Sequence, residues 1–246
     1  MSSKILVSAP VSEKYMYCFE EFVNGLKGIE YDNFEIVLIA DDMPNGNAAK
    51  ENTERMLGKL KSEGFRIVFI PWFEKARDRI KESHNKMREI VLKENFDFLL
   101  TLDMDTIPPK NIIQKLLQHD KDVVAGLYFG QHAVNNKLMQ VPFAWMFMSR
   151  EGFWGRTRYM NPDEFSSGKL FELGMAGTGC VLISKKVLEK INFRYDNSMD
   201  AADDRWFFYD CHRLGIQPYI DTSVICAHHW QARPFDWAQI KKEGKF

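Results

Sequence analysis

Strand-like and helix-like segments alternate along the first 130 residues, and this alternation restricts the fold more than any other feature of the sequence. The strand segments are short apolar runs, and the helix segments carry apolar residues at helical spacing. The predicted strands are residues 4–8, 34–40, 66–70, 96–102 and 123–127. The predicted helices are residues 13–27, 48–62, 76–94 and 110–118. This order predicts an α/β fold, in which helices cover both faces of a mainly parallel sheet.

The pattern becomes less regular after residue 130. We expect further strands at residues 141–148, 180–184 and 224–227 and further helices at residues 185–190 and 203–214. The polar, glycine-containing segment 149–170 is predicted to be a loop. No internal repeat and no Pro- or Ser-rich linker divides the sequence, so we expect a single domain over residues 1–246 with an elaborated second half.

Composition excludes several classes of partner. Lys and Arg together number 33 against 34 for Asp and Glu, so no basic field predicts binding to nucleic acid. The sequence has no apolar stretch of about 18 residues and no start resembling a signal peptide, so we expect a cytoplasmic protein without a transmembrane segment. The four cysteines lack a paired metal-binding spacing and are expected to be reduced and buried.

Two carboxylates, Asp103 and Asp105, directly follow the predicted strand 96–102, and Pro108 and Pro109 prevent that strand from continuing. Adjacent anions repel each other unless a cation lies beside them, and hard divalent cations prefer oxygen ligands. Because the same spacing arises by chance elsewhere in the chain, the interpretation depends on the preceding strand and the following prolines. We predict a metal–carboxylate site at this strand end, and a solvated turn is the alternative.

Two further pairs of polar residues also lie at the ends of predicted elements. Asp203 and Asp204 stand at the start of the last predicted helix, and His228 and His229 follow the last predicted strand. A cation held by one or two carboxylates keeps positions open for phosphates, and an added imidazole shifts the preference toward manganese. Since ligands gather at the carboxyl ends of strands in such sheets, these pairs predict a site for a metal and a phosphorylated ligand there.

Together these residues resemble the nucleotide-sugar-dependent glycosyltransferases of the GT-A fold, especially the broad family 2 group. The resemblance covers most of the chain and depends on the order and spacing of several short motifs. These motifs are Asp41-Asp42, Asn85, Asp103-Met104-Asp105, Gly177-Thr178-Gly179-Cys180, Asp203-Asp204 and His228. The resemblance implies a Rossmann-like GT-A domain, with a nucleotide-sugar-binding half at 1–130 and an acceptor-binding and catalytic half at 131–246.

The resemblance also implies that the donor is a nucleotide diphosphate sugar, with UDP favoured over GDP, lying across the first strands. The residues that would bind it are Ser8, Ala9, Pro10, Asp41, Asp42, Asn85, Asp103, Met104, Gly177 and Thr178. His84 stands where related enzymes commonly have an arginine, which removes a constant positive charge. We therefore expect Arg77 or Arg79 to substitute for it.

A divalent metal, Mn²⁺ or Mg²⁺, is the implied cofactor. The resemblance assigns its binding to Asp105 and His228, with Asp103 holding either the ribose or the metal's water shell. A metal there would stabilise the nucleoside diphosphate as the bond to the sugar breaks. A buried structural role for the histidine is the alternative.

Asp204 is the implied general base, because a carboxylate at a helix start near the donor sugar suits removal of the acceptor's proton. Asp203, beside it, is assigned either to catalysis together with Asp204 or to binding the hydroxyl groups of the acceptor. Both residues could instead only cap the helix, where negative charge is favourable. Trp206, two positions further on, is predicted to stack on the acceptor sugar.

The leading hypothesis is a metal-dependent glycosyltransferase that transfers a hexose, with inversion, to a hydroxyl of a glycan, lipid or protein. A nucleotidyltransferase acting on a sugar phosphate is one alternative, but residues 8–14 lack the glycine-rich loop that it would need. A non-catalytic module that binds nucleotide sugars or glycans is another, and Asp204 argues against it because binding requires no base. A homo-oligomer is compatible with the sequence.

Overall fold

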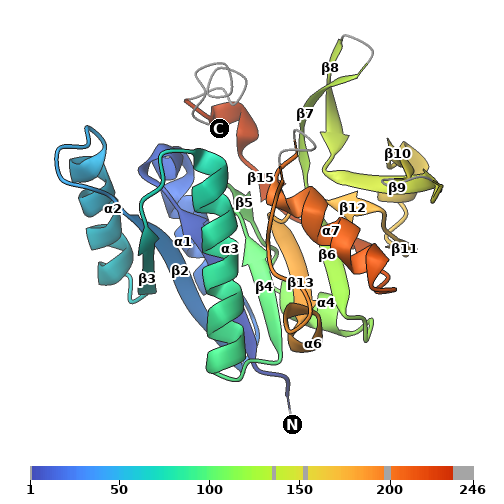
Figure 1. The fold of residues 1–246 in the computed structure, drawn as a ribbon, viewed down its shortest axis with the longest axis horizontal. Helices are drawn as coiled ribbons and strands as arrows, with labels where there is room; N and C mark the ends of the chain where they lie inside the picture. Colours follow the sequence, from blue (N-terminus) through green and yellow to red (C-terminus); the bar gives the residue numbers. More distant parts are fainter. Residues whose placement is uncertain (1, 135–136, 152–154, 197–200, 235–246) are drawn as a thin grey trace.

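The computed structural model describes residues 2–134, 137–151, 155–196 and 201–234, and an eight-stranded sheet forms its centre (Figure 1). The strand order is β11-β14-β6-β13-β4-β1-β2-β3. The strands are β1 (Ile5–Val11), β2 (Phe34–Asp42), β3 (Arg66–Pro71), β4 (Phe98–Leu102), β6 (Val123–Leu127), β11 (Leu170–Glu172), β13 (Cys180–Ser184) and β14 (Tyr219–Ile225). Only β13 and β11 run against the others, so the predicted mainly parallel sheet is confirmed.

Helices cover both faces of this sheet, as the sequence predicts. One apolar cluster joins one face to α1 (Phe19–Lys27), α2 (Lys50–Ser62) and α4 (Ile112–Leu117). A second cluster joins the opposite face to α3 (Ala76–Lys93), α6 (Lys185–Leu188) and α7 (Asp203–Arg213). Successive residues of β1 alternate between the clusters, with Ile5 and Val7 in the first and Leu6 in the second. Burial on both faces explains why the strands are continuous apolar runs.

Strand β13 comes from the second half of the chain but lies between two strands of the first half. Its Leu182 pairs with Leu100 of β4 on one side and with Val124 of β6 on the other, in both cases antiparallel. Strands β1 to β4 pair directly with one another, whereas β6 is connected to them only through β13.

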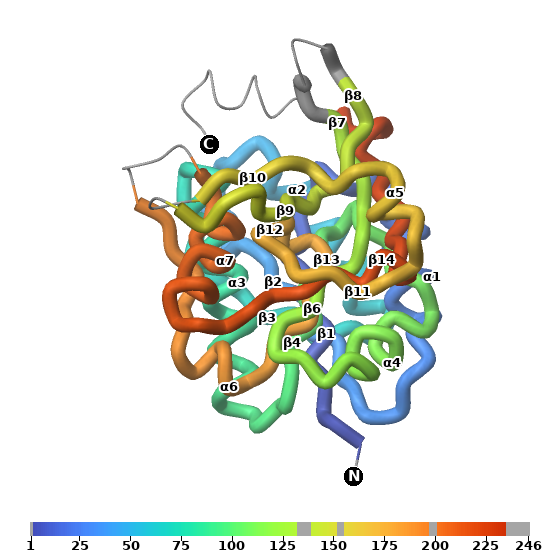
Figure 2. The backbone as a smooth tube through the Cα atoms, turned by 90° about the vertical axis from the view of Figure 1, so that its right-hand side faces the viewer, coloured from blue at the N-terminus to red at the C-terminus, as the bar shows by residue number. Residues whose placement is uncertain are grey.

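Three smaller sheets accompany the central one, and α7 lies beside one of them (Figure 2). They are the hairpin of β7 (Phe129–Val134) and β8 (Lys137–Pro142), the sheet of β10 (Arg156–Tyr159), β9 (Ala144–Ser149) and β12 (Met175–Ala176), and the pair of β15 (Ala227–His228) and β5 (Thr106–Ile107). The 3-10 helices η1 (Glu13–Cys18) and η2 (Trp230–Ala232) precede α1 and follow β15. All four cysteines are free and buried. No described helix is long and apolar enough to span a membrane.

The prediction of a loop over 149–170 is wrong, because this segment contains strand β10 and the short helix α5 (Pro162–Phe165). Helix α5 begins with a proline in its first turn and with a capping box between Asn161 and Glu164. Strand β10 is only four residues long and has no buried residue, so it lacks the alternating apolar pattern that identifies a strand.

The pairing of β15 with β5 places the end of the chain's last described strand beside the segment that follows β4. His228 pairs with Thr106, and the N–H of His229 donates to the carbonyl of Asp105 at 2.9 Å. This two-residue ladder brings an imidazole next to the Asp103–Asp105 segment.

Candidate functional site

A cavity of about 470 Å³ opens at the carboxyl ends of β1, β2 and β4. This is the place at which open α/β sheets bind ligands, and the volume lies within the range of roughly 300–1,000 Å³ typical of small-molecule sites. Both halves of the chain contribute to its walls. Nine residues predicted for the site line it: Pro10, Asp41, Asp103, Met104, Gly177, Thr178, Asp203, Asp204 and His228.

Ser8 and Ala9 lie inside the sheet and are not part of the cavity wall. Both are fully buried, and the hydroxyl of Ser8 donates to the carbonyl of Val37 in β2 at 2.5 Å. The wall at this strand end consists of Pro10 and of residues that follow it, including Ser12. The structure thus places the accessible part of this segment a few residues later than predicted.

Asp41, and not its neighbour Asp42, faces the cavity. Its carboxylate lies 3.2 Å from the guanidinium of Arg79, which also stacks on the ring of Trp72 at 4.4 Å. Burial raises the pKa of Asp41 to about 6, although the charge of Arg79 opposes the shift. Asp42 is exposed and lines a separate hollow beside α2. Arg79 thus supplies a positive charge on this side of the cavity, where Lys14 also lines the wall.

Asn85 has a structural role in this arrangement. Its side-chain amide donates to the carbonyl of Phe193 and accepts from the N–H of the same residue, both at 2.9 Å, so the predicted contact with the nucleotide is not made through this group. The adjacent His84 stacks on the ring of Phe193, with 4.8 Å between centroids.

His84 holds one of the two candidate catalytic carboxylates. Its Nδ1 lies 2.7 Å from Asp203, and the two side chains are only 1% and 3% exposed. Burial alone would lower the pKa of His84, but the carboxylate of Asp203 more than offsets this and raises it. The two side chains therefore form a buried, hydrogen-bonded pair at the start of α7.

Asp103 reaches the cavity beside two glycines that allow a close approach. A Cβ atom at Gly179 would lie 2.5 Å from Oδ2 of Asp103, and one at Gly177 would lie 2.1 Å from the hydroxyl of Tyr128. Burial and the nearby charge of Asp105 both raise the pKa of Asp103. The packing of Asp103 and Tyr128 is therefore sufficient by itself to require glycine at these two positions.

Asp105 is fully buried behind the cavity and is surrounded by donors. Its Oδ2 accepts from Nε and Nη2 of Arg233 at 2.8 and 2.7 Å and from the hydroxyl of Tyr17 at 3.0 Å. Its Oδ1 lies 3.4 Å from Nε2 of His228 and has no hydrogen-bond partner. The predicted pair of Asp105 and His228 is therefore brought together, with an arginine beside it.

The tautomer of His228 follows from its partners. Nδ1 lies 2.6 Å from the carbonyl of Phe129, which can only accept, so this nitrogen carries the proton. Nε2 lies 3.0 Å from Nη2 of Arg233, which can only donate, so Nε2 keeps its lone pair. An imidazole fixed in this way by a carbonyl is the usual form of a metal-binding histidine.

The residues present fit a divalent cation in part. The unpartnered Oδ1 of Asp105 and the Nε2 lone pair of His228 are suitable ligand atoms close to each other. Among the residues that the structure describes, no group of three His, Cys, Asp or Glu side chains is arranged to hold a metal ion. Phosphate oxygens or water would have to supply further ligands.

Asp204 lies at the first turn of α7 and lines the cavity. Its Oδ1 accepts from the N–H of Arg205 at 2.6 Å. Burial, together with the charge of Asp203, raises the pKa of Asp204 to about 7. A carboxylate with this pKa is matched to proton transfer near neutral pH.

Trp206 is not at the cavity. The side chain is 1% exposed, and the guanidinium of Arg194 covers its ring at 4.2 Å from the centroid. The predicted stacking on an acceptor sugar is therefore not available in this arrangement. The helical turn that points Asp204 into the cavity directs Trp206 into the protein.

Three residues of this arrangement were not predicted from the sequence. Arg233 and Tyr17 contact Asp105 but belong to short 3-10 or irregular segments with no recognisable motif. The sequence shows His84 only as a replacement for an arginine, and its partner Asp203 lies 119 positions away. Only the neighbourhood of a predicted anion could have indicated the need for such hydrogen-bond donors.

No known family model and no curated protein matches the sequence. Among solved structures, GalNAc-T7 with UDP, GalNAc and Mn²⁺ is 14% identical, with a TM-score of 0.61 over 92% of this chain and 44% of that one. A mycobacterial protein is 11% identical, with a TM-score of 0.55 over 97% and 70% of the two chains. S. aureus TarS with UDP is 13% identical, with a TM-score of 0.50 over 91% and 58%.

GalNAc-T7 and TarS are GT-A glycosyltransferases, and the likeness confirms the predicted GT-A, Rossmann-like fold. The chain spans 44% of the length of GalNAc-T7 and 58% of the TarS structure. At this level of identity, the likeness concerns the arrangement of the chain alone.

Proposed function

We propose that the protein is a glycosyltransferase that moves a hexose from a nucleotide diphosphate sugar to a hydroxyl acceptor, with inversion at the anomeric carbon. The observation that carries this proposal is the position of Asp204. Its carboxylate shares one cavity with Asp41 and Asp103, at the strand ends where the GT-A fold has its ligand site, and has a pKa of about 7.

UDP is the proposed nucleotide. GalNAc-T7 was solved with UDP and TarS with UDP, which supports this choice over GDP. Asp41 and Pro10 are proposed to line the nucleoside, because a carboxylate at a strand end can accept hydrogen bonds from ribose or base. Arg79 would interact with the phosphates, supplying the constant charge that His84 does not.

Asp105 and His228 are proposed to hold a divalent cation, Mn²⁺ before Mg²⁺, with Asp103 supporting the ribose or the cation's water. When bound, such a cation stabilises the negative charge that develops on the leaving diphosphate. The fixed Nδ1–H of His228 keeps Nε2 oriented toward Asp105. Arg233 would have to leave these atoms for a cation to bind.

In the proposed reaction, Asp204 removes the proton from the acceptor hydroxyl. The acceptor oxygen then forms a bond to the anomeric carbon, and the nucleoside diphosphate departs with the electron pair of the broken carbon–oxygen bond. Asp203 and His84 act as positioning residues, since their buried contact fixes the first turn of α7, from which Asp204 projects.

The test is the release of nucleoside diphosphate from a panel of UDP- and GDP-sugars. We expect release by the wild-type protein and loss of release by Asp204→Asn, while both bind the donor equally. Asp120→Asn is a matched control, because Asp120 is exposed and has a φ of 49°, which asparagine tolerates.

Equal release by the wild type and Asp204→Asn would refute the role of the base. Donor binding without any turnover in the wild type would favour a binding module. Release of pyrophosphate from a nucleoside triphosphate and a sugar phosphate would favour the nucleotidyltransferase.

A further inference from the structure

Arg233 lies between the main cavity and the buried carboxylate of Asp105. Its side chain lines this cavity and is 20% exposed, whereas the side chain of Asp105 is fully buried. Arg233 directly follows the short helix η2, and His229, just before this helix, donates its N–H to the carbonyl of Asp105 at 2.9 Å. A ligand in the cavity can therefore contact the guanidinium directly, while the carboxylate behind it is shielded.

The guanidinium contacts the same atoms that the proposed cation would use. Its Nε and Nη2 lie 2.8 and 2.7 Å from Oδ2 of Asp105, and Nη2 lies 3.0 Å from Nε2 of His228. The lone pair of this ring nitrogen can serve either the arginine or a cation, but not both. With a cation bound, Arg233 must therefore take a second position.

Most carboxylates of the cavity wall have another partner or another proposed role. The carboxylate of Asp41 lies 3.2 Å from Arg79, and that of Asp203 lies 2.7 Å from His84. The two further carboxylates of the wall are the proposed base and the proposed ligand of the ribose or of the cation's water. The diphosphate of the donor is the anion that would enter the cavity together with the cation. A guanidinium matches phosphate oxygens in geometry and charge and forms paired hydrogen bonds with them.

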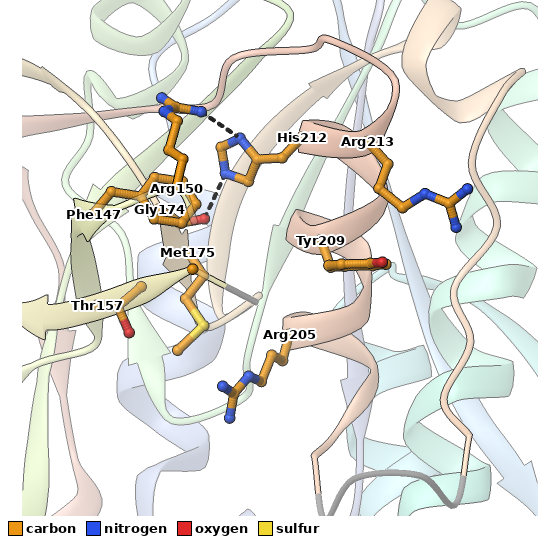
Figure 3. A pocket seen from close by; sticks show the side chains of 10 residues that line it. Phe147, Arg150, Thr157, Gly174, Met175, Arg205, Tyr209, His212 and Arg213 are labelled. Carbon is orange, nitrogen blue, oxygen red and sulfur yellow. Dashed lines mark hydrogen bonds between the residues drawn. The ribbon is translucent and has the colours of Figure 1, made fainter. Parts of the chain in front are cut away.

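The arginines of a second cavity are arranged differently. This cavity, of about 220 Å³, lies between α7 and the sheet of β10, β9 and β12 (Figure 3), and its described lining contains no Asp or Glu. Figure 3 shows Arg205 and Arg213 projecting from α7 in different directions, and Arg150 lies 3.5 Å from His212. Arg213 contacts the ring of Tyr209 and is not part of the wall of the main cavity. It therefore offers a control for the loss of an arginine outside the site.

We propose that Arg233 is a phosphate-binding residue with two positions. Without a cation it pairs with Asp105 and His228, and with a cation on those atoms it binds the diphosphate of the donor. The inference rests on the proposed function, because it assigns this residue to the binding of the same donor. Since the cation and the diphosphate both favour the second position of the arginine, each strengthens the binding of the other by the same factor.

The test measures the binding of Mn²⁺ and of inorganic pyrophosphate by calorimetry. Pyrophosphate carries the diphosphate group and does not depend on which nucleoside the protein recognises. It is titrated in excess Mn²⁺, which fills the cation site in every protein compared. We expect Arg233→Gln to bind pyrophosphate about tenfold more weakly, through the loss of one hydrogen bond between charged groups, and to bind Mn²⁺ alone more tightly. The control variant Arg213→Gln should change neither affinity.

The opposite signs of these two effects distinguish the proposed role from simpler ones. If Arg233 only blocks the cavity, its removal leaves pyrophosphate binding unchanged or makes it tighter. If Arg233 only supports the fold, its removal weakens the binding of both ligands. Either result overturns the inference, as does an unchanged affinity for Mn²⁺ or the absence of pyrophosphate binding by the wild type.

The variant Arg233→Lys keeps the test decisive if thermal unfolding shows that Arg233→Gln does not fold. Lysine retains the charge but not the paired donors, so it should also weaken pyrophosphate binding, and an unchanged affinity overturns the inference. Titrations with UDP and GDP separate this result from the proposed function. If pyrophosphate binding depends on Arg233 but neither nucleotide binds more tightly than pyrophosphate, the proposed donor is wrong and the role of the arginine is retained.

Discussion

Arg233→Gln is expected to tighten the binding of a divalent cation to the protein. The guanidinium of Arg233 contacts Oδ2 of Asp105 at 2.7 and 2.8 Å and Nε2 of His228 at 3.0 Å. The proposed cation would use the same carboxylate and the same nitrogen, so the arginine competes with it. Glutamine keeps part of the side-chain volume and removes the charge.

The size of the effect follows from the contacts that the guanidinium must give up. A hydrogen bond to a charged group contributes about 1.5 to 3 kcal/mol. Since 1.4 kcal/mol corresponds to a factor of ten, loss of this competition should lower the dissociation constant roughly 10- to 100-fold. Without cation, the fully buried carboxylate of Asp105 loses its positive partner, and the free energy of unfolding should fall by about 3 kcal/mol.

Calorimetric titration with Mn²⁺ measures the affinity, and thermal unfolding with and without Mn²⁺ measures the stability. Arg79→Gln is the matched control, because it removes another arginine of the same cavity that pairs with Asp41. The reasoning is refuted if Arg233→Gln binds Mn²⁺ no more tightly than wild type. It is also refuted if adding Asp105→Asn to that variant leaves the gain in affinity intact.

Three further substitutions test other parts of the site. Asp204→Asn should slow transfer at least 100-fold, and the wild-type rate should rise with pH through about 7, as the base loses its proton. His84→Ala should lower the free energy of unfolding by roughly 3 to 5 kcal/mol at pH 6 and by less at pH 9, because the raised pKa makes this contribution disappear as pH increases. Gly179→Ala should destabilise by about 1 to 3 kcal/mol, since its Cβ would lie 2.5 Å from a carboxylate oxygen, whereas Gly58→Ala meets no atom within 4 Å and should stabilise slightly. Thermal unfolding measures the stability changes of the His84→Ala, Gly179→Ala and Gly58→Ala variants.

The sequence predicted the central sheet well because its strands are buried on both faces. The predicted strand 34–40 corresponds to β2 and the predicted strand 123–127 to β6, with the same type and nearly the same bounds. Strands such as β5, β12 and β15 have only two residues each, which is too short to show any period. Their existence depends on pairing with distant segments, which no local pattern records.

The candidate site was predictable where a residue's position follows from the end of an element. Asp41, Asp103 and Asp204 were placed after strands or at a helix start, and all three line the main cavity. The direction in which a side chain points was not predictable. Asn85 is an example, because its side-chain amide hydrogen-bonds to the backbone of Phe193. Contacts between residues far apart in the sequence could likewise not be predicted.

The position of β13 between β4 and β6 has a consequence for how the molecule unfolds. A fragment ending near residue 130 would contain β4 and β6 but nothing to fill the gap between them, and both would expose an unpaired edge. We therefore expect residues 1–130 and 131–246 to behave as one cooperative unit and not as separable modules. We expect heat or denaturant to unfold the whole chain in a single transition, with the candidate base and the cation ligands lost at the same temperature.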